Sequence, residues 1–180
     1  MAKAEEGFRS LFDLKRDRVR REEEVLFLGF AVGDQAYAVR IPSVREILKV
    51  PRLYSMPKVP AFVKGVMDLR GQILPVVDLK ERLDLGSVDL KKGRVVVLNA
   101  GKTALGFLVD QVREVFSVAP SALKSAPEVF HQPQMAFIEG MVRSGEALYL
   151  LLEPASVLTP REMKTLEAQA WDAPPPRPAE

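Results

Sequence analysis

Few side chains in this sequence are placed for catalysis. The chain of 180 residues has no cysteine and a single histidine, His131, which excludes thiolate and histidine-cluster metal sites and leaves little room for a serine–histidine–aspartate triad. Asp78 and Asp110 each follow an aliphatic run, but no motif sets a second acid–base group beside them. Gly29 and Gly33 lack the following helix that a dinucleotide site requires. The sequence therefore predicts no catalytic site, metal or cofactor, and both aspartates are expected to bond backbone N–H groups.

The side chain best suited to recognition is an arginine at a predicted turn. Residues 63–79 recur at 138–154 with a constant offset of 75, which aligns Gly65 with Gly140. The second copy keeps the apolar pattern but has no arginine in place of Arg70, so the fold does not require one there. A guanidinium presents five N–H donors, and arginine is frequent among interface hot spots. Arg70 is therefore a candidate for function rather than for architecture.

A second repeat supplies a control for the residues near Arg70. With an offset of 68, residues 44–47 (Val-Arg-Glu-Ile) align with residues 112–115 (Val-Arg-Glu-Val). Val44 and Glu46 keep their residue types in the second copy, which suits a common architectural role such as a carboxylate bonding a neighbouring strand. Arg70 can pair with Glu46 or present its donors to a partner. The two repeats together predict two related halves of roughly 60–75 residues, each a small barrel, because glycines stand at the same places in the matched runs.

Apolar residues alternating with a period of two, between turn residues, predict a mainly β fold. Residues 42–50 fit one helical turn or a strand equally well. Residues 51–61 and 119–137 are rich in proline and are expected to form a stiff connection and a long surface loop. The expected strands are Val25–Val32, 35–41, 62–69, 72–79, 94–99, Thr103–Val109, 112–118, 137–142 and Ala147–Leu152.

The same patterns divide the chain into segments. Residues 1–24 form a charged arm whose apolar residues recur near helical spacing, and residues 159–171 form a C-terminal helix that starts with a capping box at Thr159 and Glu162. Residues 25–85 and 86–158 are the two expected barrel subdomains, and the proline-rich residues 172–180 are an expected disordered tail.

Composition narrows the class of protein. The formal net charge is +2, which is too balanced for a typical nucleic-acid-binding domain. No apolar run is long enough for a signal peptide or a membrane span. A cytoplasmic protein that neither binds nucleic acid nor inserts into a membrane is expected.

Several motifs together resemble one family. Residues 30–41 followed by 44–47, and the run Leu-Arg-Gly-Gln-Ile-Leu-Pro-Val-Val-Asp-Leu at 69–79, are similar to the CheW-like chemotaxis coupling proteins. The second half agrees through residues 106–112 and 138–140. The resemblance extends from about residue 25 to 158, and the combination of motifs is highly specific.

The resemblance implies an all-β fold of two SH3-like, five-stranded barrels with short terminal helices. It implies an adaptor without catalytic activity that joins the cytoplasmic tip of chemoreceptors to the regulatory domain of a CheA-type histidine autokinase. The protein is then expected to be recruited from the cytoplasm to membrane-associated receptor arrays. By position, Val44, Glu46, Gly65, Arg70 and Gly71 match family residues tied to receptor and kinase contact.

Two other functions are compatible with the sequence. One is a coupling paralogue of a non-flagellar pathway, such as surface motility or development. The other is a β-barrel enzyme or small-ligand protein with a site in the groove between the halves, which would need convergent polar groups that the sequence does not indicate.

Asp68 departs from the family pattern, which usually has asparagine at this position of the turn.

Overall fold

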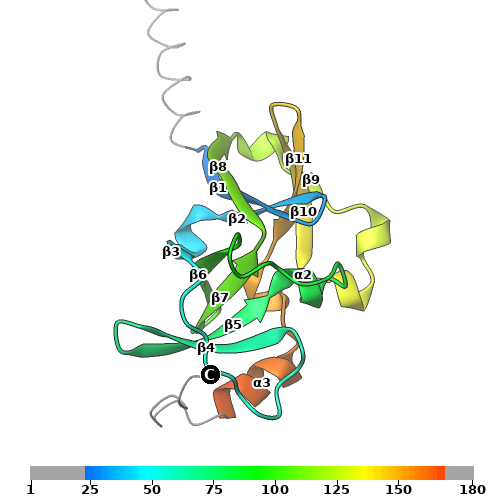
Figure 1. The fold of residues 1–180 in the computed structure, drawn as a ribbon. Helices are drawn as coiled ribbons and strands as arrows, with labels where there is room; N and C mark the ends of the chain where they lie inside the picture. Colours follow the sequence, from blue (N-terminus) through cyan, green and yellow to red (C-terminus); the bar gives the residue numbers. More distant parts are fainter. Residues whose placement is uncertain (1–22, 169–180) are drawn as a thin grey trace, which may run out of the picture.

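The computed structural model describes residues 23–168, so nearly all of the expected arm and the whole of the expected tail lie outside the described residues (Figure 1). Short helices α2 (Leu79–Arg82) and α3 (Pro160–Ala168) accompany the strands. The strands are β1 (Val25–Val32), β2 (Gln35–Arg40), β3 (Val44–Lys49), β4 (Val63–Leu69), β5 (Gln72–Asp78), β6 (Arg94–Ala100), β7 (Thr103–Val109), β8 (Gln111–Val118), β9 (Lys124–Ser125), β10 (Ile138–Ser144) and β11 (Ala147–Leu152).

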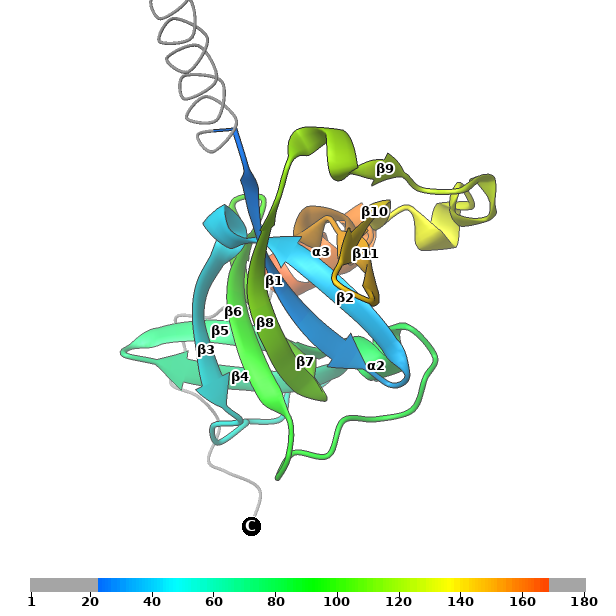
Figure 2. The ribbon, with the colours of Figure 1, turned by 90° about the horizontal axis from the view of Figure 1, so that it is seen from above.

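The strands form two sheets, which confirms the predicted all-β fold class. One sheet has the order β3-β6-β7-β5-β4, and we call it the first barrel. The other has the order β8-β1-β2-β11-β10-β9, and we call it the second barrel. Its additional strand, β9, is only two residues long. Figure 2 shows the strands of the two barrels crossing one another, with α3 beyond the second barrel.

The two barrels exchange hairpins. The β1–β2 hairpin, from the first half of the chain, lies in the second barrel, and the β6–β7 hairpin from the second half lies in the first. Parallel pairing of β5 with β7 and of β11 with β2 joins each exchanged hairpin to its new sheet. The sheets therefore cross the boundary expected between residues 85 and 86. The repeat shows which segments are related, but long-range pairing decides which sheet each one joins.

Irregularities in the strand pairing follow the sequence repeat. The pairing of β3 with β6 skips Arg45, and the pairing of β8 with β1 skips Arg113. The pairing of β4 with β5 skips Lys64, and that of β10 with β11 skips Glu139. Such bulges bend a strand and increase its twist. Because the bulges recur at the offsets of 68 and 75, the two barrels share their curvature as well as their strand order.

A large apolar core holds the barrels together. Phe30 and Leu150 from the second barrel and Phe107 from the first belong to the same buried cluster, while each barrel also has a smaller core of its own. Burying an aromatic or large aliphatic side chain contributes about 1.5–3 kcal/mol. Leu166 of α3 is also buried in this cluster, with Met163 packed beside it. The two barrels are therefore fixed against each other.

Both strand-ending aspartates bond backbone N–H groups, as predicted. Asp78 is fully buried; its Oδ1 accepts the N–H of Lys80 at 2.9 Å and its Oδ2 that of Val88 at 3.0 Å. Burial raises the pKa of Asp78, while the backbone bonds from Val88 and Glu81 oppose the increase. Asp110 Oδ2 accepts the N–H of Gly33 at 2.7 Å. These carboxylates hold the turns that follow β5 and β1.

The structure adds detail to three connections that were expected from the sequence. The ambiguous residues 42–50 begin with a 3₁₀ turn at Ile41–Ser43 and continue as strand β3. Residues 72–79 end as a strand at Asp78 because its carboxylate caps α2. The long loop expected at 119–137 contains the short strand β9 and three 3₁₀ turns. Proline at the first position of two of these turns favours the tight conformation.

The capping box predicted for the C-terminal helix is confirmed. The Thr159 N–H donates to Glu162 Oε2 at 2.7 Å, and the Glu162 N–H donates to Thr159 Oγ1 at 3.1 Å. The Arg82 Nε donates to the Val157 carbonyl at 3.0 Å and joins α2 to the start of this helix. The remainder of the predicted helix, residues 169–171, lies outside the described residues.

Replacing Glu81 with glutamine is expected to reduce the acid sensitivity of folding. Bonds from Lys64 and Ser87 lower the pKa of Glu81. The stabilisation by a carboxylate with a lowered pKa is present above its ordinary pKa of about 4.3 and is lost as the pH falls through the folded pKa. At pH 7 the wild type should exceed Glu81→Gln by about 0.5–1 kcal/mol in unfolding free energy. Urea unfolding at neutral and acidic pH tests this, and a difference that is constant with pH would contradict it.

Candidate partner-binding site

Arg70 and Gly71 form the two-residue turn between β4 and β5. Their φ angles are +51° and +87°, the sign that a type I′ hairpin turn requires at both central residues. Asp68 Oδ1 accepts the Gly71 N–H at 2.8 Å. An asparagine carbonyl oxygen accepts such a bond in the same way, so Asp68 preserves the hydrogen bond of the turn. The repeat-related turn has Gly145 at φ +58° in place of Arg70.

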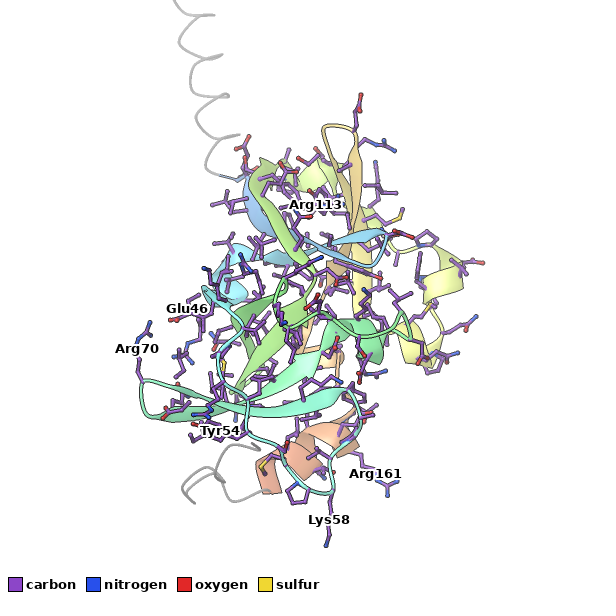
Figure 3. The ribbon with its side chains drawn as sticks, in the orientation of Figure 1. Glu46, Tyr54, Lys58, Arg70, Arg113 and Arg161 are labelled. Atoms are coloured by element: carbon purple, nitrogen blue, oxygen red, sulfur yellow. The ribbon has the colours of Figure 1, made fainter. Side chains whose placement is uncertain are left out.

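The turn directs Arg70 towards the edge of β3. Its Nη1 donates to Glu46 Oε2 at 2.9 Å and its Nη2 to Glu46 Oε1 at 3.1 Å. Figure 3 shows Arg70 at the tip of its hairpin, next to Glu46. The Arg70 side chain is nevertheless 75% exposed, against 24% for Glu46. The predicted pairing of Arg70 with Glu46 is therefore confirmed. The guanidinium also keeps an exposed face and further N–H donors.

The repeat-related glutamates share a structural role. Glu46 holds the β4–β5 turn through Arg70, whereas Glu114 accepts the hydroxyl of Tyr149 on β11 at 2.7 Å. Glu114 thus bonds a strand of its own barrel, as the repeat suggested, whereas Glu46 bonds the turn between two strands. Val44 is half-buried and packs on the core between the barrels. Arg70 and Gly71 therefore form the exposed part of the candidate site, and the half-buried Val44 and Glu46 lie beside it on β3.

Gly65 lies apart from this turn. It is buried in β4, five positions before Arg70, which is about 16 Å along an extended strand. Its φ is +133°, and a Cβ atom here would lie 2.1 Å from the Tyr54 carbonyl oxygen. The structure therefore does not bring Gly65 together with Arg70. Gly65 permits the close approach of residue Tyr54, whose N–H and C=O both bond Val66.

The described residues contain no cluster of metal-binding side chains. Among residues 23–168, no group of three or more histidine, cysteine or acidic side chains could hold a metal ion. His131 lies in the loop after β9, where its Nε2 is 2.9 Å from the Ala126 carbonyl oxygen. No helix in the described part of the chain is long and apolar enough to cross a membrane.

Comparison with known proteins agrees with the fold of two barrels. The profile of the CheW-like domain matches residues 26–162. The chain belongs to the CheW-like family. The chemotaxis protein CheW of Treponema pallidum is 29% identical over 150 residues, covering 81% of this chain and 88% of that protein. Protein PilI of Pseudomonas aeruginosa is 35% identical over 86 residues, covering 47% and 48% of the two chains.

A solved structure supports the CheW-like assignment. The scaffolding protein TtCheW from Thermoanaerobacter tengcongensis aligns with a TM-score of 0.69 and 25% sequence identity, covering 77% of this chain and 90% of that one. Together with the family match, this makes the chain a chemotaxis coupling protein of the CheW type. The apolar repeat that predicted two barrels is thus the CheW-like fold, with Arg70 and Glu46 on the edge of its first barrel.

Proposed function

We propose that this protein is an adaptor without catalytic activity, which couples the cytoplasmic tip of chemoreceptors to the regulatory domain of a CheA-type histidine autokinase. It acts in the cytoplasm, at membrane-associated receptor arrays. The observation that carries the proposal is Arg70, an exposed arginine preorganised by a bidentate bond to Glu46 in a CheW-like barrel. A fixed guanidinium loses little conformational freedom when a partner binds.

The proposed contact surface has direct and indirect contributors. Arg70 and Gly71 lie at the exposed turn and contact a partner directly. Glu46 holds Arg70 in place from β3, and Val44 adds apolar surface next to it. Gly65 acts indirectly, because it is buried and sets the position of Tyr54. This division separates the five family-matched residues by mechanism, since a change at the turn affects binding and a change at Gly65 affects folding first.

Reconstitution of three components tests the adaptor function. Kinase autophosphorylation is measured with receptor and kinase, with and without this protein, and the binding of the purified chain to each partner is measured separately. We expect receptor-dependent kinase activity only when the chain is present, and no turnover by the chain alone. Binding to neither the receptor tip nor the kinase regulatory domain would overturn the proposal.

The similarity to PilI supports a second candidate of the same biochemical kind. In this version the chain couples the receptors and kinase of a non-flagellar pathway, such as surface motility or development. Reconstitution with receptors and kinases from each type of pathway separates the two, because specificity is a difference between two affinities.

A further inference from the structure

The exposed edge of β3 in the first barrel carries a row of cations. Lys49 on β3 lies directly opposite Arg94 on β6, and Arg45 Nη1 donates to Gln72 Oε1 at 3.3 Å beside the Arg70 turn. We call the following residues the cationic edge: Arg45, Lys49, Arg70, Lys92 and Arg94.

The cationic edge is poorly neutralised within the protein. Of its members, Arg70 alone has a carboxylate partner among the described residues, Glu46. Arg94 Nη1 donates to the carbonyl groups of Lys92 and Gly93 at 3.1 and 2.8 Å, which provide no negative charge. Like charges that lie opposite each other on paired strands are destabilising. The protein therefore tolerates an unfavourable concentration of positive charge along this edge.

The second barrel shows that the fold does not need Lys49, Lys92 or Arg94, whereas Arg45 has a counterpart in Arg113. At the repeat offset of 68, Ser117 stands in place of Lys49 and Glu24 in place of Lys92. At the same offset Leu26 replaces Arg94. Strands β8 and β1 nevertheless pair as β3 and β6 do, with a bulge at the equivalent position. Because one backbone plan folds with either set of side chains, the cations of the first barrel require another explanation.

A groove of mixed polar and apolar lining lies beside the cations. It has a volume of about 490 Å³ and is lined by Ile47, Lys92, Arg94, Asp110, Gln111 and Val112, between the edge of the first barrel and the start of β8. Ile47 is 42% exposed. The carboxylate of Asp110 is already bonded to the Gly33 N–H and the Lys80 ammonium. The groove thus presents the apolar side chains of Ile47 and Val112 next to the cations Lys92 and Arg94.

We propose that the cationic edge and this groove bind an acidic amphipathic segment of a partner protein. Carboxylates of the segment pair with Lys49, Lys92 and Arg94, while its apolar side chains contact Ile47 and Val112. The inference rests on the proposed adaptor function and adds the chemistry of the partner: the receptor tip or the kinase domain that docks on the first barrel carries carboxylates at that contact. Complementary charge of this kind speeds association and selects among partners.

A protein segment fits this surface better than a phosphate polymer or an anionic membrane. Ile47 lies between Arg45 and Lys49 on the exposed side of β3. A phosphate backbone would offer no apolar group to contact it. No aromatic residue lines the groove to stack on a base. The whole chain also carries a net charge of only +2, because acidic residues elsewhere offset the cationic edge.

Charge reversal in the full-length chain tests the proposal. Lys49→Glu combined with Lys92→Glu changes two exposed cations of the edge. Lys58→Glu combined with Lys102→Glu is the matched control, since it changes two exposed lysines elsewhere in the same barrel by the same charge. Figure 3 shows Lys58 far from Glu46 and Arg70. Affinities for the receptor tip and for the kinase regulatory domain are measured by calorimetry, and thermal unfolding verifies that each variant folds.

The expected result is a loss of about tenfold or more in affinity for at least one partner at about 50 mM NaCl, which shrinks at about 500 mM as salt screens the charges. The control pair should stay within about twofold of the wild type. Wild-type affinity of the folded Lys49→Glu/Lys92→Glu variant for both partners would overturn the proposal and leave the adaptor function standing. A wild-type chain that binds neither partner would instead overturn the adaptor function. The docking proposal would also be overturned if the Lys49→Glu/Lys92→Glu variant lost binding only to a duplex RNA or a phosphatidylglycerol vesicle and not to either protein partner.

Discussion

Replacing Gly65 with alanine is expected to lower the unfolding free energy by about 3 kcal/mol. Two costs combine at this position. The φ of +133° is strained for any residue with a Cβ atom, and that atom would lie 2.1 Å from the Tyr54 carbonyl oxygen. The obstacle is backbone, so relief requires moving Tyr54 and breaking its two bonds with Val66. The melting temperature should fall by roughly 10 °C, as measured by calorimetry.

Gly71→Ala in the same hairpin is the matched control. Gly71 also has a positive φ, +87°, but no atom lies within 4 Å of the position that a Cβ would occupy. Its substitution should therefore cost only the backbone strain, about 1 kcal/mol. Equal losses for the two variants would show that the approach of Tyr54 does not limit stability. Gly140→Ala extends the comparison, because its Cβ would meet the Lys124 carbonyl oxygen at 2.5 Å in the second barrel.

Replacing Arg70 with glycine is expected to separate partner binding from stability. Arg70 adopts a φ of +51°, which costs a residue with a Cβ about 1 kcal/mol or more, and the second barrel has glycine at φ +58° in the same place. Glycine removes this strain, while loss of the exposed pair with Glu46 costs about 0–1 kcal/mol. The unfolding free energy should therefore change by less than about 1 kcal/mol. Affinity for a partner should fall by about thirtyfold or more, as for an interface hot spot.

Arg70→Ala should weaken binding to the same extent and be less stable than Arg70→Gly, because alanine retains the strain. Exchange of the two charges, Glu46→Arg with Arg70→Glu, distinguishes two roles of the pair. If the pair only holds the turn, the exchange should restore binding. If the partner contacts the exposed guanidinium, as we propose, the exchange should bind no better than Arg70→Gly in a titration of the purified partner. A destabilised Arg70→Gly that binds normally once folded would contradict the proposal.

The local elements and their repetition could be predicted from the sequence. A period of two in the apolar residues, with glycine turns, predicted the hairpins at 25–41 and 62–79, since side chains alternate between the faces of a strand. The capping box at Thr159 and Glu162 has a local mechanism and was also confirmed. Residues 42–50 stayed ambiguous because a short apolar run fits a helical turn or a strand. Pairing with β6 decides in favour of the strand.

The candidate site was predictable in part. The repeat distinguished Arg70, which has no counterpart, from Val44 and Glu46, which do. It also contained an unused signal at Lys49, Lys92 and Arg94, whose repeat partners are not cations. Lys49 ends β3, Lys92 precedes β6 and Arg94 begins it, and the pairing of β3 with β6 brings them to one edge. Their proximity could not be inferred without that pairing.

The sequence by itself determined that this chain forms two related β barrels, with an arginine at one turn that the fold does not demand. Only the tertiary structure decided that the barrels exchange hairpins, that Gly65 is buried beneath Tyr54, and that Arg70 bonds Glu46. The physical reason lies in the range of the interactions. Backbone preference and side-chain alternation act over a few residues, whereas the choice of pairing partner depends on burying a common core built from segments distant in the chain.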